Sequence, residues 1–193
     1  SQASGLDLIP KEKRDPLIAS TYGTGILVKN ALERGCNEII LGIGGSATTD
    51  GGAGIFEALG GLLIDKNGNN LDKGGVSLKK LYKIIPPKIS RKITWKVACD
   101  VTNPILGKNG AVNVYSQQKG ASEEDIVILN ESLTNFVKII EKNFKRKISN
   151  LVGGGAAGGT AAGLHGFFGA TLDSGFFILS DLIGLEKEIK DFD

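Results

Sequence analysis

The stretch IILGIGGSATTDGGAG, residues 39–54, decides the fold of this chain. It begins with an apolar run, which is typical of a buried strand in a parallel sheet. The run passes directly into a segment of glycines, hydroxyl residues and one carboxylate, and we expect a helix to follow from Ile55. In open α/β folds a ligand binds where a strand gives way to a loop and then a helix. The stretch therefore predicts both a parallel α/β sheet and a binding site at its edge.

The residue types in this loop suit an anion. Glycine lets the backbone approach a ligand closely, and a helix N-terminus supplies unpaired N–H donors. Hydroxyl groups donate to phosphate or carboxylate oxygens, and Asp50 can hold a metal ion or accept a proton. The candidate binding residues here are Gly44, Gly45, Ser46, Thr48, Thr49 and Gly51. The alternative is a glycine-rich tight connection that binds nothing, because glycine loops are common turn formers.

Two further positions carry side chains suited to chemistry. The alternating segment 94–99 predicts a strand, and Asp100 follows at its C-terminal tip, where ligands bind in α/β folds. A turn around Asn103 that only caps this strand is the alternative. Lys119 precedes a glycine and can present its ammonium group to a phosphate. Its alternative role is that of a solvated lysine before a helix, since lysine is usually exposed.

The rest of the pattern alternates helices and strands, which is typical of an α/β domain. Apolar spacing and turn signals predict helices over 26–33, 122–144, 160–168 and 182–192, strands over 38–43, 59–65, 94–99 and 176–179, and a short strand or turn over 112–115. The segment 74–87 is interpreted as a polar connector. We therefore expect a mixed, mostly parallel sheet with flanking helices, within a single α/β domain over residues 1–193.

Composition narrows the class of protein. The chain has 193 residues, 41% of them hydrophobic and 23% charged, with a net charge of +2, which is typical of a soluble globular protein. The sequence has no cluster of basic residues that would indicate a nucleic-acid partner. It also has no apolar run long enough to span a membrane. Cys36, Cys99 and a single histidine, His165, make no zinc set, so both cysteines are expected to be buried thiols of a cytoplasmic protein. The chain contains no methionine and opens like mid-domain sequence, so we expect an internal piece of a longer protein.

A second glycine-dense stretch covers residues 151–159. Gly153, Gly155 and Gly158 formally match the dinucleotide-binding pattern GxGxxG, and Asp173 lies at about the spacing of a ribose-binding acid. The strand before this match is short, however, and the helix after it is barely two turns. The alternative is that small residues let this helix pack tightly beside the first glycine loop.

Familiar nucleotide and hydrolase motifs are absent from the sequence, including GxxxxGK[ST], GxSxG and HExxH. What remains is a set of glycine-rich loops suited to anions, two carboxylates at Asp50 and Asp100, and Lys119. This combination favours an enzyme that handles a small anionic substrate, with phosphoryl transfer as a candidate reaction.

The chain resembles the bacterial glycerate kinase family along essentially its whole length. The motifs that carry the resemblance are IGGSATTDGGAG (43–54), VACDVTNP (97–104), QKGA (118–121) and GAAGG (155–159), with ASGL (3–6), KRDP (13–16) and GTG (23–25) in support. Ile26 stands where the family often has an acid, and Ser116 and Gln117 replace its usual Gly-Pro. Neither departure removes a candidate catalytic group.

The resemblance implies ATP-dependent phosphorylation of D-glycerate to a phosphoglycerate, with Mg²⁺. On this basis Asp50, Asp100 and Lys119 are the expected catalytic residues, and Asp50 or Asp100 is the expected Mg²⁺ ligand. The residues expected to bind substrate or phosphate are Gly44, Gly45, Ser46, Thr48, Thr49, Gly51, Asn103, Gly155 and Gly158.

The family fold implied by the resemblance has two α/β domains, one inserted into the other, and this chain corresponds to the inserted domain. We expect it to be inactive alone, because the active site should lie in the cleft between domains. The competing hypothesis is an isolated lobe that binds a small anion without catalysis. The sequence leaves open which hydroxyl is phosphorylated, which lobe holds ATP, and whether a homodimer forms.

Overall fold

A three-stranded parallel sheet forms one layer of the molecule. The computed structural model describes residues 2–185 and residue 189. The strands are β1 (Glu38–Gly42), β4 (Thr94–Ala98) and β5 (Thr171–Asp173), in the order β1-β4-β5. Leu41 pairs with Val97, and Val97 pairs with Leu172. The parallel α/β architecture expected from the sequence is confirmed, with a separate antiparallel pair beside it, β2 (Leu62–Ile64) and β3 (Lys83–Ile85).

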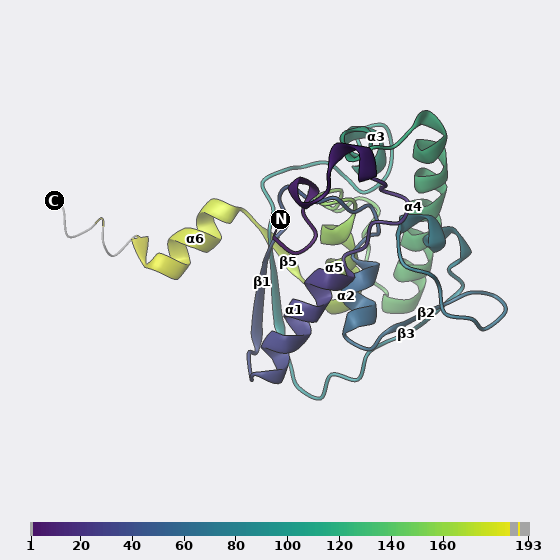
Figure 1. The fold of residues 1–193 in the computed structure, drawn as a ribbon. Helices are drawn as coiled ribbons and strands as arrows, with labels where there is room; N and C mark the ends of the chain where they lie inside the picture. The colour runs from purple at the N-terminus through teal and green to yellow at the C-terminus, as the bar shows by residue number, and fades with distance from the viewer. Residues whose placement is uncertain (1, 186–188, 190–193) are drawn as a thin grey trace.

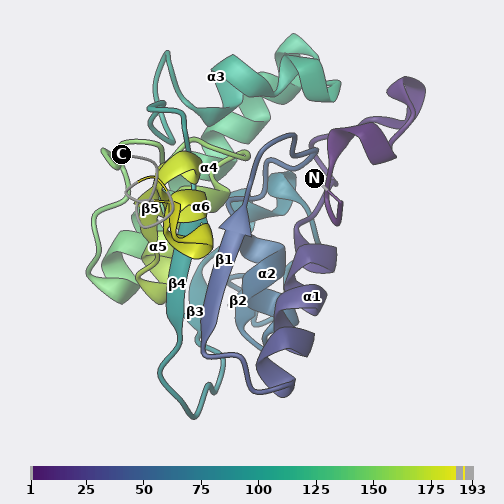
Figure 2. The same cartoon turned by 90° about the vertical axis from the view of Figure 1, so that its left-hand side faces the viewer.

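Helices pack in layers against this sheet. The α-helices are α1 (Tyr22–Glu33), α2 (Ala53–Ala58), α3 (Ala111–Tyr115), α4 (Glu123–Phe144), α5 (Thr160–Phe168) and α6 (Gly175–Ile183), and 3₁₀ turns cover Leu6–Leu8, Lys11–Lys13, Gly75–Lys80 and Gln117–Lys119. In Figure 1, α1, α2 and α5 lie between the sheet and α4, and α6 projects away from the body. Figure 2 shows β1 between β4 and the pair α1 and α2.

Two hydrophobic clusters meet at α2. One joins the sheet to the inner helices through residues such as Leu41, Ile55 and Val97. The other joins α2 to α4 through residues such as Phe56 and Phe136. Because neighbouring residues of α2 enter different clusters, this short helix is buried on several sides. Apolar burial of this kind is the main term that stabilises the fold, and it fixes α2 behind the glycine-rich loop.

The long helix α4 forms as its sequence predicts. Ser122 is the N-cap, and its side chain accepts from the Asp125 amide while the Asp125 carboxylate accepts from the Ser122 amide. This capping box satisfies two amides that the helix itself leaves free. The buried residues of α4 recur at helical spacing and face the second cluster: Leu129, Leu133, Phe136, Val137 and Ile140.

The short strand or turn predicted over 112–115 and the strand predicted over 176–179 are both wrong. Residues 112–115 lie in helix α3, which begins after Gly110, and residues 176–179 lie in helix α6. In α6 the Ser174 hydroxyl accepts from the Phe176 amide, and this N-cap outweighs the β-propensity of the aromatic pair. The helix expected over 182–192 overlaps only the end of α6, which stops at Ile183 with Gly184 as its left-handed C-cap, and most of the remaining predicted range lies outside the described residues. The connector 74–87 contains the Gly75–Lys80 turn and β3.

The expected burial of both cysteines is also wrong. Cys36 is exposed, because it follows the turn that ends α1, while Cys99 is half-buried at the end of β4. Among the described residues, no helix has the length and apolar character that crossing a bilayer requires. Helix α6 nevertheless carries a set of exposed apolar side chains: Phe176, Phe177, Leu179, Leu182 and Ile183.

The two glycine-rich stretches pack directly on each other. The Gly51 amide donates to the Gly158 carbonyl over 3.1 Å. A Cβ atom at Gly158 would overlap the Thr48 carbonyl, and one at Gly163 would overlap the Gly51 carbonyl. The interpretation of these small residues as a packing surface is confirmed. The element directly before Gly153 is helix α4, with no strand between them in the described chain, so the context that a dinucleotide fingerprint needs is missing.

We expect Gly163→Ala to lower the free energy of unfolding by about 3 kcal/mol, because the new methyl group meets a backbone atom that cannot move aside easily. Gly23→Ala is the matched control, since its Cβ would lie 3.4 Å from the nearest atom, on an exposed turn of α1. Urea unfolding of both variants measures the difference. Equal stability of the two would contradict the tight packing described above.

Candidate functional site

A cavity of about 350 Å³ opens beside the loop between β1 and α2. We call residues 43–52 the β1–α2 loop and this hollow the Lys119 cavity. Its lining comes from five segments: Leu6 and Asp7; Ile43–Ser46; Ala98–Val101; Tyr115, Gln118 and Lys119; and Ala156 and Ala157. The C-terminal ends of β1 and β4 therefore meet here, as expected for a ligand site in a parallel sheet.

Lys119 brings a buried positive charge to this cavity. Its side chain is only 2% exposed, and Nζ donates to Ser46 Oγ over 3.0 Å and to the Thr48 carbonyl over 2.6 Å. Burial lowers the pKa of the ammonium group to about 8, although the negative charge of Asp50 opposes the shift. The solvated lysine considered from the sequence is thus not what the structure shows. The charge lies under the β1–α2 loop, where low dielectric strengthens its attraction for an anion.

The first part of the β1–α2 loop presents backbone donors to the same cavity. Gly45 has a φ of 66°, and its carbonyl accepts from the Leu6 amide over 2.9 Å. The Ala47 amide donates to the Ser4 carbonyl, which holds the loop from the other side. Within the described chain, the amides of Gly44, Gly45 and Ser46 have no acceptor. Amides of successive residues left free in this way form a typical anion-binding concavity.

Asp50 lies away from the cavities and has no exposed surface. Its Oδ2 accepts from the Thr21 amide over 2.7 Å and from the Thr21 hydroxyl over 2.8 Å, and the amides of Gly52 and Gly54 donate to the same carboxylate. Burial raises the pKa of Asp50, and these hydrogen bonds oppose the shift. The carboxylate joins the start of α1 to the loop and to the start of α2. Its environment is that of a positioning residue.

Asp100 lies at the edge of the Lys119 cavity. Its Oδ1 accepts from the Ser174 hydroxyl over 2.8 Å and from the Gly175 amide over 3.0 Å, so the carboxylate also caps α6. Its Oδ2 has no hydrogen-bond partner among the residues described. One carboxylate oxygen is therefore held in place while the other is available to a ligand at the cavity edge.

The other predicted site residues lie behind the cavities. Thr49 Oγ1 lies 3.4 Å from Ser116 Oγ, and Asn103 Oδ1 accepts from the Tyr115 hydroxyl over 2.8 Å. The predicted binding glycines Gly51, Gly155 and Gly158 are close-packing positions whose added Cβ atoms would meet Phe136, Pro104 and Thr48. Among the predicted binding residues, those that line a cavity are Gly44, Gly45, Ser46 and Thr48.

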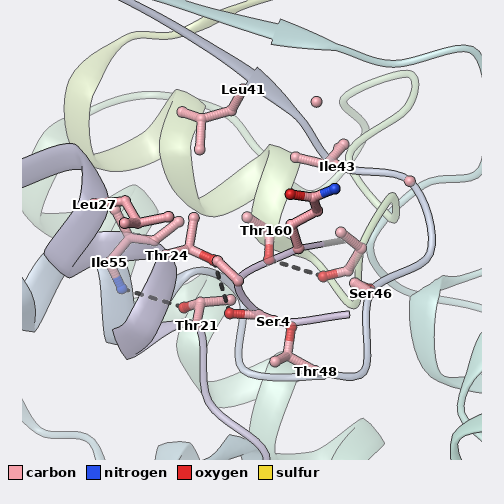
Figure 3. Close-up of a pocket in the computed structure, with 15 residues that line it drawn as sticks. Ser4, Thr21, Thr24, Leu27, Leu41, Ile43, Ser46, Thr48, Ile55 and Thr160 are labelled. Atoms are coloured by element: carbon pink, nitrogen blue, oxygen red, sulfur yellow. Dashed lines mark hydrogen bonds between the residues drawn. The ribbon is translucent and has the colours of Figure 1, made fainter. Parts of the chain in front are cut away.

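A second cavity, of about 220 Å³, lies on the other side of the same loop (Figure 3). We call it the Thr48 cavity. Its lining is Gln2, Ala3, Ser4, Thr21, Thr24, Leu27, Leu41–Gly44, Ser46, Thr48, Ile55, Ala157 and Thr160. The sequence motif GTG (23–25) supported the family resemblance, but Ser4, Thr24 and Thr160 were not assigned to a site. Tyr115 and Gln118 of the Lys119 cavity were also missed. Gln118 belongs to the family motif QKGA, whereas no sequence signal pointed to Tyr115.

The implied Mg²⁺ suits Asp100 better than Asp50. Mg²⁺ is usually bound by one or two carboxylates together with substrate phosphates and water. The free Oδ2 of Asp100 fits such a site, whereas the carboxylate of Asp50 is enclosed by protein donors. No cluster of three or more metal-ligating side chains exists within the described parts of the chain.

The chain is an α/β protein with a glycine-rich loop at the end of a parallel strand, and this loop lines two cavities. The model of the glycerate kinase family matches residues 1–193. The chain is 48% identical over 193 residues to glycerate 2-kinase of Escherichia coli, covering 98% of this chain and 50% of that protein. It is 47% identical to glycerate kinase of Halalkalibacterium halodurans, covering 100% of this chain and 52% of that protein.

A solved structure shows the same architecture. The crystal structure of a protein assigned as glycerate kinase 2 from Salmonella typhimurium LT2 matches with a TM-score of 0.89 and 45% identity, over 96% of this chain and 50% of that one. The chain belongs to the glycerate kinase family, and it spans about half the length of the curated relatives it matches. The kinase family implies the use of ATP.

We expect Asp50→Asn to lower the free energy of unfolding by about 3 kcal/mol, because an amide NH₂ would replace an acceptor that faces several N–H and O–H donors. Asp72→Asn, at an exposed position, is the control and should change stability by less than about 0.5 kcal/mol. Chemical denaturation compares the two. Wild-type stability in Asp50→Asn, with turnover alone reduced, would show that Asp50 acts in the chemistry instead.

Glu57, on α2 near Asp50, should make the free energy of unfolding depend on pH. Burial and the negative charge of Asp50 raise its pKa to about 7, while Lys73 opposes the shift. The stability that the protonated carboxyl contributes is therefore complete below about pH 4.5 and lost as the pH rises through 7. We expect Glu57→Gln to be more stable than the wild type at pH 8, with a flatter profile from pH 4.5 to 7. Urea unfolding at a series of pH values measures the free energy of unfolding of both proteins. The same pH dependence in the two proteins would refute this prediction.

Proposed function

We propose that this chain carries part of the active site for ATP-dependent phosphoryl transfer to D-glycerate, giving a phosphoglycerate. The observation that carries the proposal is the Lys119 cavity, where a buried ammonium group, free loop amides and a carboxylate converge. Phosphoryl transfer needs mainly positioning and electrostatic stabilisation, and these groups supply both. Membership of the glycerate kinase family supports the choice of donor and acceptor.

Each group at the cavity has a distinct role in this proposal. The amides of Gly44 and Gly45 and the hydroxyl of Ser46 bind anionic oxygens of the ligand. Lys119 neutralises negative charge on the transferring phosphoryl group, and its contact with the Thr48 carbonyl fixes its position. Asp50 holds the β1–α2 loop and both adjoining helices in place from behind.

Asp100 acts on the acceptor in this proposal. The hydroxyl oxygen of glycerate attacks the terminal phosphorus of ATP, the bond from that phosphorus to the bridging oxygen breaks, and ADP leaves. The free Oδ2 of Asp100 takes the hydroxyl proton or holds Mg²⁺. When bound, Mg²⁺ would supply further neutralisation of phosphate charge.

We expect Lys119→Met to reduce kcat/KM by at least about 100-fold, because the variant keeps the side-chain length and removes the charge. Lys108→Met, at an exposed lysine of another loop, should leave turnover unchanged. In the wild type, kcat/KM should fall as the pH rises through about 8, since the protonated ammonium is the active form. A coupled assay of ADP formation with D-glycerate measures kcat/KM of the two variants and the pH dependence of kcat/KM in the wild type.

The same assay separates catalysis from simple anion binding. If Lys119→Met turns over D-glycerate within about threefold of the wild type, the Lys119 cavity is not the phosphoryl-transfer site. If the intact wild-type protein binds D-glycerate or ATP but forms no ADP, the chain is an anion-binding lobe, and the proposed reaction is refuted.

A further inference from the structure

The Thr48 cavity differs chemically from the Lys119 cavity. No Asp, Glu, Lys, Arg or His side chain is present in its lining, as far as the chain is described. Its walls are aliphatic, with Leu27 from α1, Leu41 and Ile43 from β1 and its end, and Ile55 from α2. A phosphate or carboxylate would lose its hydration here without gaining a charged partner, which is unfavourable. The cavity instead suits a neutral group with apolar faces and hydrogen-bonding edges.

One hydroxyl in this cavity has no partner. Ser4 Oγ and Thr24 Oγ1 lie 2.7 Å apart, Thr160 Oγ1 donates to the Ala157 carbonyl over 2.8 Å, and Thr21 Oγ1 is bonded to Asp50. Thr48 Oγ1, by contrast, is buried without any hydrogen-bond partner, and Thr48 is only 1% exposed. Figure 3 shows this hydroxyl directed toward Ser4, on the cavity side.

An unpaired buried hydroxyl costs about 1–3 kcal/mol. Such a group in a native fold therefore needs an explanation. A ligand group that bonds to Thr48 Oγ1 would recover this free energy on binding.

The two cavities adjoin along the β1–α2 loop. Gly42 lines the Thr48 cavity through its backbone, because its side-chain position on β1 lies on the opposite face from Leu41. Gly44 lines both cavities and also has open space where a side chain would stand. Ile43, Ser46 and Ala157 are shared by both linings as well. The two cavities therefore share one stretch of loop backbone.

We propose that the Thr48 cavity binds the uncharged nucleoside end of the phosphoryl donor, with Thr48 Oγ1 hydrogen-bonded to it and the phosphates in the Lys119 cavity. The inference rests on the proposed function, because it assumes a nucleotide donor. The volume of about 220 Å³ suits a fragment of a nucleotide, since pockets for whole drug-sized ligands run from about 300 to 1,000 Å³. The division into a neutral and a charged cavity matches the two ends of such a donor.

Adenosine tests the Thr48 cavity, and inorganic tripolyphosphate tests the Lys119 cavity. In isothermal titrations of the intact protein, Thr48→Val should bind adenosine about five- to tenfold more weakly, because it loses one hydrogen bond at constant shape. Leu27→Trp should weaken adenosine binding by more than about tenfold, because Leu27 lines the cavity from α1 and the larger side chain would fill part of it. Neither variant should change tripolyphosphate binding, whereas Lys119→Met should weaken tripolyphosphate and leave adenosine unaffected.

A stability readout distinguishes this role from a structural one. Thr48→Val removes an unpaired buried hydroxyl, so its melting temperature should equal or exceed that of the wild type. Thr134→Val is the matched control: its exposed hydroxyl bonds only within α4, and its adenosine affinity should be that of the wild type.

The outcomes also separate this inference from the proposed reaction. Absence of adenosine binding to the wild type, or wild-type affinity in both Thr48→Val and Leu27→Trp, overturns it even if phosphoryl transfer to D-glycerate is observed. If these variants lose D-glycerate binding while adenosine binding is unaffected, the inference is overturned, because the Thr48 cavity then binds the phosphoryl acceptor. Adenosine binding that depends on Thr48, in a protein that transfers no phosphate, supports the cavity assignment and refutes the reaction.

Discussion

The buried carboxylate of Asp50 is the interaction on which the site geometry depends. It accepts hydrogen bonds from Thr21 at the start of α1 and from Gly52 and Gly54 around the start of α2. A buried charge is tolerated only when such donors surround it, and removing them leaves an uncompensated cost. The carboxylate thus fixes the positions of two helices and the intervening loop relative to one another. Close packing of Gly158 and Gly163 against that loop then leaves it little freedom to relax.

The loop held in this way separates two environments. On one side, Lys119 lies beneath the backbone with its ammonium group bonded to Ser46 and Thr48. On the other side, aliphatic walls surround a hydroxyl without a partner. Because the same few loop residues line both cavities, a small change in the backbone of Ile43–Ser46 alters both at once. Rigid support from Asp50 is therefore a requirement for a ligand that would occupy both sides.

Sequence reasoning found the parts of the structure that depend on local pattern. The apolar run before Gly42, the capping box at Ser122 and the spacing of α4 led to correct elements, because short-range chemistry specifies them. It failed at residues 176–179, where the Ser174 cap outweighs β-propensity. It could also not reveal that Asp50 is enclosed while Asp100 is open, since burial is set by α1, a helix distant in sequence. The unpaired state of Thr48 likewise depends on contacts between segments.

Asp100 contacts the N-terminus of α6 and also lines the Lys119 cavity. Because its Oδ1 caps α6, the orientation of the carboxylate follows that of the helix. Helix α6 itself exposes a row of apolar side chains, including Phe176 and Phe177. Anything that packs on this row and tilts the helix must rotate the carboxylate or break its cap. The chemistry at the cavity edge is therefore mechanically coupled to a surface that lies outside the cavity.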